Sequence, residues 1–290
     1  MTRLAVIYAT LGRPELAKKV IDHLSVQTRQ PDMVVVSAVT QADIAGLEVS
    51  PMAPEILLGS KGSCVQRNRA IDFVGDKADI LLFFDDDFVP APTFLAELVN
   101  IFENNPAIAG VTGRVLADGI KTPGIAFEDA VRQLEGDVLP EVDTLPARET
   151  LYGCNMAIRV SLARDIRFDE RLPLYGWLED IDYTYRVAKN GPMVTSNRST
   201  GIHLGVKGGR TSGVKFGYSQ IANPIYMLRK KTIPPKLAYE RLARNFYANL
   251  IYSLKPEPYV DRLGRLRGNL IAISDFCRGR LDPERILKMD

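Results

Sequence analysis

Short apolar runs and amphipathic segments alternate through the first 116 residues of the chain. The runs at 4–10, 33–39, 55–59, 79–84 and 108–116 are rich in apolar and β-branched residues, which is typical of buried strands. Between them, the segments 14–28, 63–74 and 92–105 repeat apolar residues at helical spacing. This alternation predicts a parallel, doubly wound sheet, in which ligands bind at the carboxyl ends of the strands.

The rest of the chain has a less regular pattern. Residues 117–150 are rich in Pro, Gly and acidic residues, and we expect them to form an excursion beside the site. Residues 151–200 mix helix and strand patterns, and the Gly-rich, basic segment 203–217 predicts a mobile loop. Helical patterns follow from 218 to 231, from 235 to 255, and more weakly to the end.

Composition places the chain among ordinary globular proteins. Of 290 residues, 46% are hydrophobic and 25% charged, and the net charge of +2 is too balanced to indicate a nucleic-acid partner. The three cysteines lack metal-type spacing, which favours a reducing compartment. The N-terminal residues lack a signal-peptide pattern, and there is no run of 18 apolar residues. We therefore expect a cytoplasmic protein.

The motif LLFFDDDFVP ends an apolar strand with Asp85, Asp86 and Asp87. Adjacent carboxylates repel one another, so they indicate a bound cation, and oxygen ligands suit Mg²⁺ or Mn²⁺. A solvated acidic turn is the structural alternative. Fingerprints of dinucleotide-binding domains, P-loops, serine hydrolases and zinc proteases are missing from the sequence.

Two further signals accompany this motif. In GWLEDIDYTYR, Glu179 and Asp180 are adjacent acids at a predicted helix start, where one can act as a general base or both can simply favour the helix dipole. His203 follows a predicted strand, and a lone histidine there is more often structural than a ligand.

These motifs together resemble glycosyltransferase family 2, the inverting, nucleotide-sugar-dependent enzymes of the GT-A fold. The resemblance covers about residues 3–230 and rests on VIYATLGRP, GSKGSCVQRNRAID, LLFFDDDFVP, YGCNMAIR and LYGWLEDIDYTYRV, in this order. It implies an α/β fold, with a Rossmann-like nucleotide-binding mixed sheet flanked by helices and a helical C-terminal extension. The implied catalytic domain is 1–217, with a nucleotide-sugar-binding half to about 116 and an acceptor-binding half at 117–217. Residues 218–290 form the C-terminal region.

The resemblance also implies roles for single residues. Asp85 and Asp87 match the Asp-x-Asp motif that holds Mn²⁺ or Mg²⁺, His203 lies where many members place a further metal or diphosphate contact, and Asp180 matches the catalytic base. The sugar and acceptor would be bound by Gly153, Cys154, Asn155, Trp177 and Glu179. The donor nucleotide and diphosphate would be bound by residues at strand ends, the Arg67 motif and the Gly-rich loop: Ala9, Thr10, Arg13, Ser37, Lys61, Arg67, Asp85, Asp86, Lys207 and Arg210.

One position departs from the family pattern. Members commonly carry an acid just after the second strand that contacts the base or ribose, whereas this chain has Ser37 and no acid before Asp43. The base preference therefore stays open, with a UDP- or dTDP-sugar expected as the donor.

The expected enzyme is a metal-dependent, inverting hexosyl- or deoxyhexosyltransferase of polysaccharide biosynthesis that acts on a hydroxyl of a glycan or lipid-linked acceptor. A sugar-phosphate nucleotidyltransferase and an inactive sugar-nucleotide-binding relative are the alternatives. The basic, aromatic C-terminal region leaves three interpretations open: a helical cap on the catalytic domain, a homodimer contact, or peripheral contact with the inner face of the plasma membrane.

Overall fold

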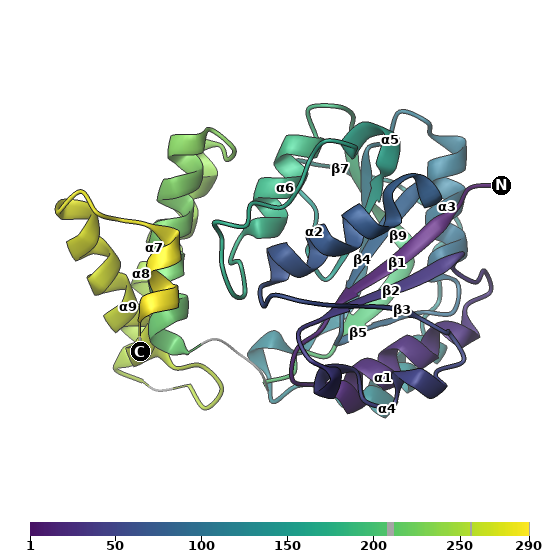
Figure 1. Ribbon diagram of the computed structural model, residues 1–290, viewed down its shortest axis with the longest axis horizontal. Helices are drawn as coiled ribbons and strands as arrows, with labels where there is room; N and C mark the ends of the chain where they lie inside the picture. Colours follow the sequence, from purple (N-terminus) through teal and green to yellow (C-terminus); the bar gives the residue numbers. More distant parts are fainter. Residues whose placement is uncertain (208–211, 256, 290) are drawn as a thin grey trace. The chain divides into compact units, whose positions relative to one another are not determined.

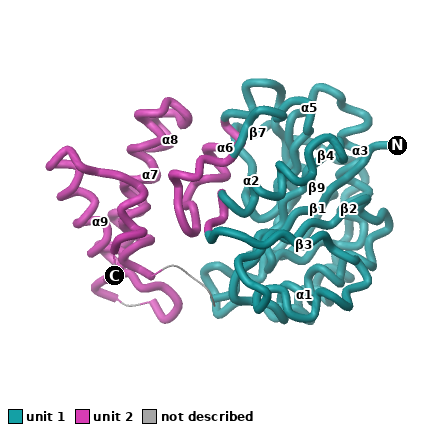
Figure 2. Tube along the Cα trace, in the orientation of Figure 1, with its two compact units in different colours: residues 1–61, 65–167, 186–209 teal, residues 62–64, 168–185, 210–290 magenta. Residues whose placement is uncertain are grey.

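The structure is a computed structural model that describes residues 1–207, 212–255 and 257–289 (Figure 1). By its contacts the chain divides into two compact units (Figure 2). Unit 1 contains residues 1–61, 65–167 and 186–209, and unit 2 contains residues 62–64, 168–185 and 210–290. None of the described helices combines the length and apolarity needed to cross a lipid bilayer.

Among the described residues of unit 1, nine strands form one mixed sheet, in the order β3-β2-β1-β4-β8-β6-β9-β5, with β7 paired to β9. The strands are β1 (Leu4–Ala9), β2 (Met33–Ala38), β3 (Glu55–Leu58), β4 (Ile80–Asp85), β5 (Phe88–Pro90), β6 (Gly110–Asp118), β7 (Ala147–Arg148), β8 (Asn155–Arg159) and β9 (Met193–His203).

The first four strands are parallel, as the alternating pattern predicts. The fifth run, β6, runs in the same direction as these strands but is not paired with β4, because β8 lies between β4 and β6 and is antiparallel to both. The strand β6 instead pairs in parallel with β9. The sheet is therefore mixed, in agreement with the GT-A fold class and not with a purely parallel sheet.

Helices cover both faces of the sheet (Figure 1). They are α1 (Pro14–Asp22), α2 (Ser63–Val74), α3 (Phe94–Asn104), α4 (Phe127–Glu135) and α5 (Val160–Ala163). The apolar faces of α1, α3 and α4 enter one core with β1, β2 and β4. Because the crossovers β1–α1–β2 and β3–α2–β4 run in opposite directions along the sheet, right-handed connections place α1 and α2 on opposite faces.

Unit 2 is mainly helical. Its helices are α7 (Gly213–Lys230), α8 (Pro235–Ser253) and α9 (Arg262–Cys277), and the helix α6 (Glu179–Val187) begins in this unit. The predicted C-terminal helices are thus present, with α7 beginning five residues before the predicted 218. The predicted functional halves and the domain boundary at 217 stay predictions.

Candidate metal and donor site

The carboxyl ends of three parallel strands meet at one register of the sheet. Ala9, the last residue of β1, pairs with Ser37 of β2 on one side and with Asp85 of β4 on the other. The backbone amide of Thr10 then donates to the carbonyl oxygen of Ser37 at 3.1 Å. The expected strand-end residues Ala9, Thr10, Ser37 and Asp85 are therefore neighbours.

The aspartates at the end of β4 lie beside His203 at the end of β9. His203 Nε2 is 3.3 Å from Asp87 Oδ1 and 4.0 Å from Asp85 Oδ2. One ligand atom from each of the three residues lies within 4.8 Å of the others. Pairing of Phe88 in β5 with His203 in β9 accounts for this approach, because Asp87 directly precedes Phe88. The structure thus brings together the three predicted metal ligands.

Two residues that the sequence analysis did not single out hold the other side of His203. His203 Nδ1 lies 3.2 Å from Asp118 Oδ1, and the hydroxyl of Tyr152 donates to Asp118 Oδ2 at 3.0 Å. Asp118 ends β6 and pairs with His203 in the sheet register. The sequence did carry a signal for Asp118, because this residue is an acid at the end of an apolar strand.

The carboxylates make His203 a strong base. Burial by itself lowers the pKa of His203, but its hydrogen bonds to Asp118 and Asp87 outweigh burial and raise the pKa to about 10. Burial by itself raises the pKa of Asp87, but the hydrogen bond and the charge of His203 outweigh this effect and hold the pKa of that carboxyl below its usual range. Burial raises the pKa of Asp85. The neighbouring carboxylates therefore favour the protonated form of His203.

Arg13 and Thr10 bind the third aspartate of the motif. Thr10 Oγ1 donates to Asp86 Oδ2 at 2.6 Å, and Arg13 forms an ion pair with Asp86 and a second one, at 3.3 Å, with Asp87. Asp86 is fully buried, and burial raises its pKa against the charge of Arg13. Asp86 therefore ties the loop after β1 to the metal cluster.

Arg67 of α2 reaches the same cluster. Its Nη2 donates to Asp85 Oδ1 at 3.1 Å and to the carbonyl oxygen of Gly153 at 3.4 Å. The carbonyl oxygen of the neighbouring Cys154 accepts a hydrogen bond from the amide of Asp85 at 3.1 Å. The side-chain oxygen of Asn155 accepts from Thr112 Oγ1 and from the amide of Gly113, at 2.5 and 2.9 Å, so it joins β8 to β6.

The end of β2 carries Ser37 and no acidic residue. Asp43, farther along the chain, reaches the loop after β1. Its Oδ1 accepts from the amide of Gly12 at 2.7 Å. The hydroxyl of buried Ser37 accepts from Arg69 Nη1 at 3.0 Å. Lys61, by contrast, is exposed after β3.

The basic residues expected to cover the phosphates can be placed only in part. Lys207 Nζ donates to the carbonyl oxygens of Gly119 and Ile120 at 2.9 and 2.6 Å, next to Asp118. The amide of Val206 donates to Asp87 Oδ2 at 3.0 Å, so this segment begins at the metal cluster. Arg210 lies outside the described residues.

The predicted catalytic and acceptor residues of unit 2 lie at the start of α6. Glu179 is buried and Asp180 is half-buried. The indole ring of Trp177 contacts Phe216 edge-on, with ring centroids 5.0 Å apart, and its buried Nε1 has no hydrogen-bond partner among the described residues. Asp180 also contributes to the electrostatic field at Arg241 of α8.

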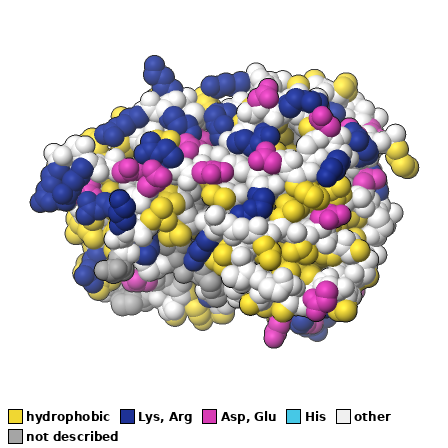
Figure 3. Space-filling model, viewed as in Figure 1, with side chains coloured by type: hydrophobic (Ala, Val, Ile, Leu, Met, Phe, Trp, Pro, Cys, Tyr) yellow, Lys and Arg dark blue, Asp and Glu magenta, His cyan; other side chains and the backbone are white. Residues whose placement is uncertain are grey.

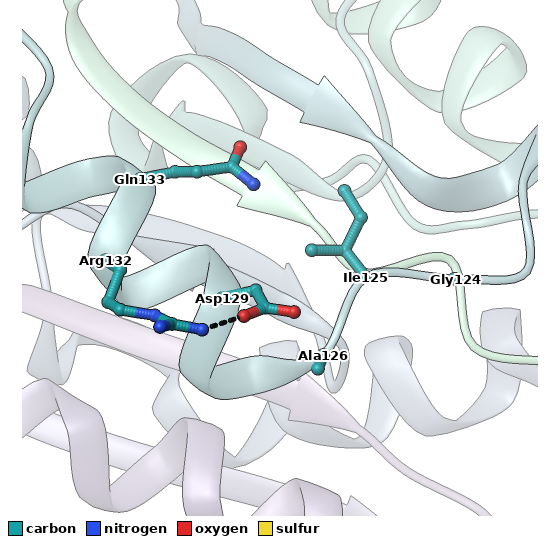
Figure 4. Close-up of a pocket in the computed structure, with 6 residues that line it drawn as sticks. All are labelled: Gly124, Ile125, Ala126, Asp129, Arg132 and Gln133. Carbon is teal, nitrogen blue, oxygen red and sulfur yellow. Dashed lines mark hydrogen bonds and ion pairs between the residues drawn. The ribbon is translucent and has the colours of Figure 1, made fainter.

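A surface pocket of about 470 Å³ lies elsewhere, at the start of α4 (Figure 4). Its two charged side chains, Asp129 and Arg132, form an ion pair with each other. No predicted site residue lines it, so it gives no reason to move the site from the strand ends.

The donor set of Asp85, Asp87 and His203 fits a divalent ion. Carboxylate oxygens suit Mg²⁺ and Mn²⁺, and His203 can ligate through Nε2 once that nitrogen is deprotonated. Its Nδ1 faces the carboxylate of Asp118, the arrangement that orients histidine ligands in metal sites.

No protein-family model matches the chain, and no curated protein matches it in sequence. Solved structures do share its fold. Staphylococcus aureus TarS aligns with a TM-score of 0.55 and 17% identity over 88% of this chain and 44% of the TarS chain. The chain therefore spans less than half of that protein.

Two further structures carry nucleotides. A shorter S. aureus TarS chain in complex with UDP-GlcNAc aligns with a TM-score of 0.57 and 16% identity, over 98% of this chain and 83% of that one. Mycobacterium tuberculosis glucosyl-3-phosphoglycerate synthase, solved with Mn²⁺, UDP and glucosyl-3-phosphoglycerate, aligns with a TM-score of 0.51 and 17% identity, over 81% and 82%. The chain has the GT-A-type fold of these structures, as its motifs predicted.

Proposed function

We propose that the chain is a metal-dependent glycosyltransferase that moves a sugar from a nucleoside-diphosphate sugar to a hydroxyl of a glycan or lipid-linked acceptor. The observation that carries the proposal is the cluster of Asp85, Asp87 and His203 at the carboxyl end of β4. This edge is where open α/β sheets bind ligands. Solved structures of the same fold with UDP and UDP-GlcNAc support a nucleotide-sugar donor.

The surroundings of the cluster suit a diphosphate. Arg13 and Arg67 lie against the aspartates, and Lys207 follows from the end of β9. Guanidinium groups bind phosphate oxygens with two parallel hydrogen bonds, so these arginines are suited to exchange an aspartate for a phosphate. A bound divalent ion would stabilise the negative charge of the leaving nucleoside diphosphate.

The proposed reaction is a single displacement. The bond between the anomeric carbon and the diphosphate oxygen breaks, the acceptor oxygen forms a bond to that carbon, and Asp180 takes the proton of the acceptor hydroxyl. A single displacement inverts the anomeric configuration. Product NMR that showed a retained configuration would contradict Asp180 as the base.

The first test is a thermal-shift series with UDP, dTDP, GDP and their sugar conjugates, each with Mn²⁺, with Mg²⁺ and with EDTA. We expect one nucleotide to raise Tm by about 5 °C at a hundredfold excess over Kd, and only with metal. Asp87→Ala should remove this rise. Asp129→Asn, which changes an exposed acid of α4, should keep it.

The reaction products separate the alternatives. A transferase releases a nucleoside diphosphate and a glycosylated acceptor, whereas a nucleotidyltransferase forms a sugar nucleotide from a sugar phosphate and releases pyrophosphate. If the chain binds a donor but neither transfers its sugar nor slowly hydrolyses it, the inactive relative is favoured. If no nucleotide gives a metal-dependent rise in Tm, the proposed donor site is contradicted.

A further inference from the structure

The C-terminal helices expose large apolar side chains. Of the 21 large hydrophobic residues exposed in the described chain, twelve lie within residues 235–289, about one fifth of its length. One helical face carries Tyr247, Leu250 and Ile251 of α8 and Leu254, the residue after its end, because Tyr247 and Ile251 are four residues apart and so are Leu250 and Leu254. Tyr247 is 60% exposed, Ile251 59% and Leu254 88%. Leu263, Leu270 and Ile273 of α9 are exposed as well.

The inner faces of the same helices carry buried amides beside apolar residues, such as Leu242 and Ile271, that pack against a core cluster. The buried residues of α8 are Ala238, Asn245 and Asn249. Asn249 Nδ2 donates to the side-chain oxygens of Gln220 in α7 and Asn269 in α9, at 2.7 and 2.9 Å. Asn269 in turn donates to the carbonyl oxygen of Gly217 at 2.6 Å. A water-facing helix normally keeps its large apolar side chains inside, whereas here several of them lie outside and amides lie inside.

Small residues allow α7 and α9 to pack closely. Gly264, Gly268 and Ala272 recur every four residues along the buried side of α9. A Cβ at Gly268 would lie 2.1 Å from the carbonyl oxygen of Val214, and one at Gly217 would lie 2.0 Å from that of Arg265. Small residues and interhelical amide hydrogen bonds hold helices together where the surroundings are lipid and not water.

The same segment is basic. Residues 235–289 contain 11 Lys and Arg and six Asp and Glu, a net charge of +5, whereas the whole chain has +2. On the face drawn in Figure 3, Lys and Arg side chains gather over the C-terminal helices. Arg244 of α8 and Arg267 of α9 are exposed on the helices that carry the apolar side chains.

We propose that the outer face of α8 and α9 docks on an anionic lipid bilayer, with its aromatic and aliphatic side chains at the lipid boundary and its cations on the headgroups. Apolar residues combined with basic ones on helix surfaces bind bilayers in this way. A second copy of the chain is a poorer occupant, because a twofold contact would place two surfaces of the same positive charge against each other.

The docking surface goes beyond the reaction and does not depend on the donor site. Its consequence for the acceptor does rest on the proposed function: docking would hold the enzyme where a lipid-linked acceptor is, and would favour that acceptor over a free glycan. Vesicle binding is measured without donor or metal, so a failure of docking and a failure of the proposed reaction are distinguishable.

The test is flotation of the full chain with vesicles of phosphatidylcholine alone and of phosphatidylcholine mixed with phosphatidylglycerol. We expect binding to the mixed vesicles that falls sharply between about 0.1 M and about 0.5 M NaCl, and at least about tenfold weaker binding to the neutral ones. Equal binding to both vesicles, or no binding to either, would overturn the proposal.

Three variants locate the surface. A triple variant with Tyr247→Ser, Ile251→Ser and Leu254→Ser should lose most vesicle binding while keeping its circular dichroism spectrum, because these side chains are exposed. Arg244→Gln and Arg267→Gln should each weaken binding to anionic vesicles by about fivefold. Val49→Ser, an exposed apolar residue of unit 1, is the matched control and should bind as the unaltered chain does.

The competing occupant gives a different result. If the surface joined two copies, sedimentation would show a concentration-dependent dimer that the triple serine variant abolishes, and vesicles would not compete with it. That outcome would replace the bilayer by a second copy of the chain and would overturn the proposal.

Discussion

The side-chain amide of Asn223 in α7 donates a hydrogen bond to the carbonyl oxygen of Trp177 at 2.9 Å and contacts that of Gly176 at 3.5 Å. The turn that it holds directly precedes Glu179 and Asp180, and it contains three residues with positive φ: Leu174 at 59°, Gly176 at 79° and Leu178 at 73°. Such conformations persist only where neighbouring groups hold them. Within unit 2, Asn223 is one of these groups, and Ser63 is another through bonds to the carbonyl oxygens of Leu174 and Tyr175.

We expect Asn223→Ala to lower the free energy of unfolding by about 2 kcal/mol, because the variant leaves buried carbonyl oxygens without their donor. If the turn positions the acids of α6, kcat should fall more than the KM for the donor rises. Urea unfolding and steady-state kinetics measure both effects. Asn104→Ala, at an exposed position of α3, should change neither, and an equal effect there would contradict the role of Asn223.

Gly176→Ala should be more damaging than an ordinary Gly→Ala change. Its φ is +79°, and an added Cβ would lie 2.7 Å from Ser63 Oγ and 3.1 Å from Glu179 Cγ. We expect a loss of about 1–3 kcal/mol in thermal or urea unfolding. At Gly136, φ is −88° and the nearest atom would be 3.8 Å away, so Gly136→Ala should be within about 0.5 kcal/mol of the unaltered chain.

Asp180→Asn tests the proposed base. Removal of a general base typically costs about 100-fold or more in rate, so kcat should fall by at least that factor while the metal-dependent thermal shift with the donor stays unchanged. Asp165→Asn, an exposed acid of unit 1, should keep full activity. A loss of less than about threefold at Asp180 would show that another group accepts the proton.

The stability of the chain should depend on pH through Asp275. This carboxylate is 1% exposed, accepts from Arg280 Nε at 2.7 Å and from the Tyr218 hydroxyl at 3.1 Å, and pairs with Arg285. Burial by itself raises the pKa of Asp275, but the bonds to Arg280 and Tyr218 outweigh it and lower the pKa below 3.8.

A group with a lowered pKa in the folded state stabilises the fold above its unfolded pKa, and this contribution disappears as the pH falls through its folded pKa. Asp275→Asn should therefore lower Tm at pH 7, and the difference from the unaltered chain should shrink below about pH 4. Thermal unfolding at a series of pH values measures this. A difference that stays constant to pH 3 would contradict the role of the ionised carboxylate, and Glu135→Gln, an exposed acid of α4, is the control.

The local pattern of the sequence was sufficient for the first half of the sheet. The apolar runs from Leu4 to Asp85 form four parallel strands, because strands buried on both faces and joined by helices read as continuous apolar segments. The same strand-end rule that selected Asp85 and Asp87 would also have selected Asp118. His203 joined these acids through pairing of β9 with β5 and β6, which no local pattern specifies.

Tertiary structure decided two further features. The insertion of β8 between β4 and β6 makes the sheet mixed, because strand partners far apart in sequence are set by the packing of the whole sheet and not by the periodicity of one strand. On α8, the sequence determined that apolar and amide residues lie on different helical faces. Only packing against Gln220 and Asn269 decided that the amides face inward, because buried amides need hydrogen-bond partners and these two residues supply them. As a consequence, Tyr247, Ile251 and Leu254 lie on the outside.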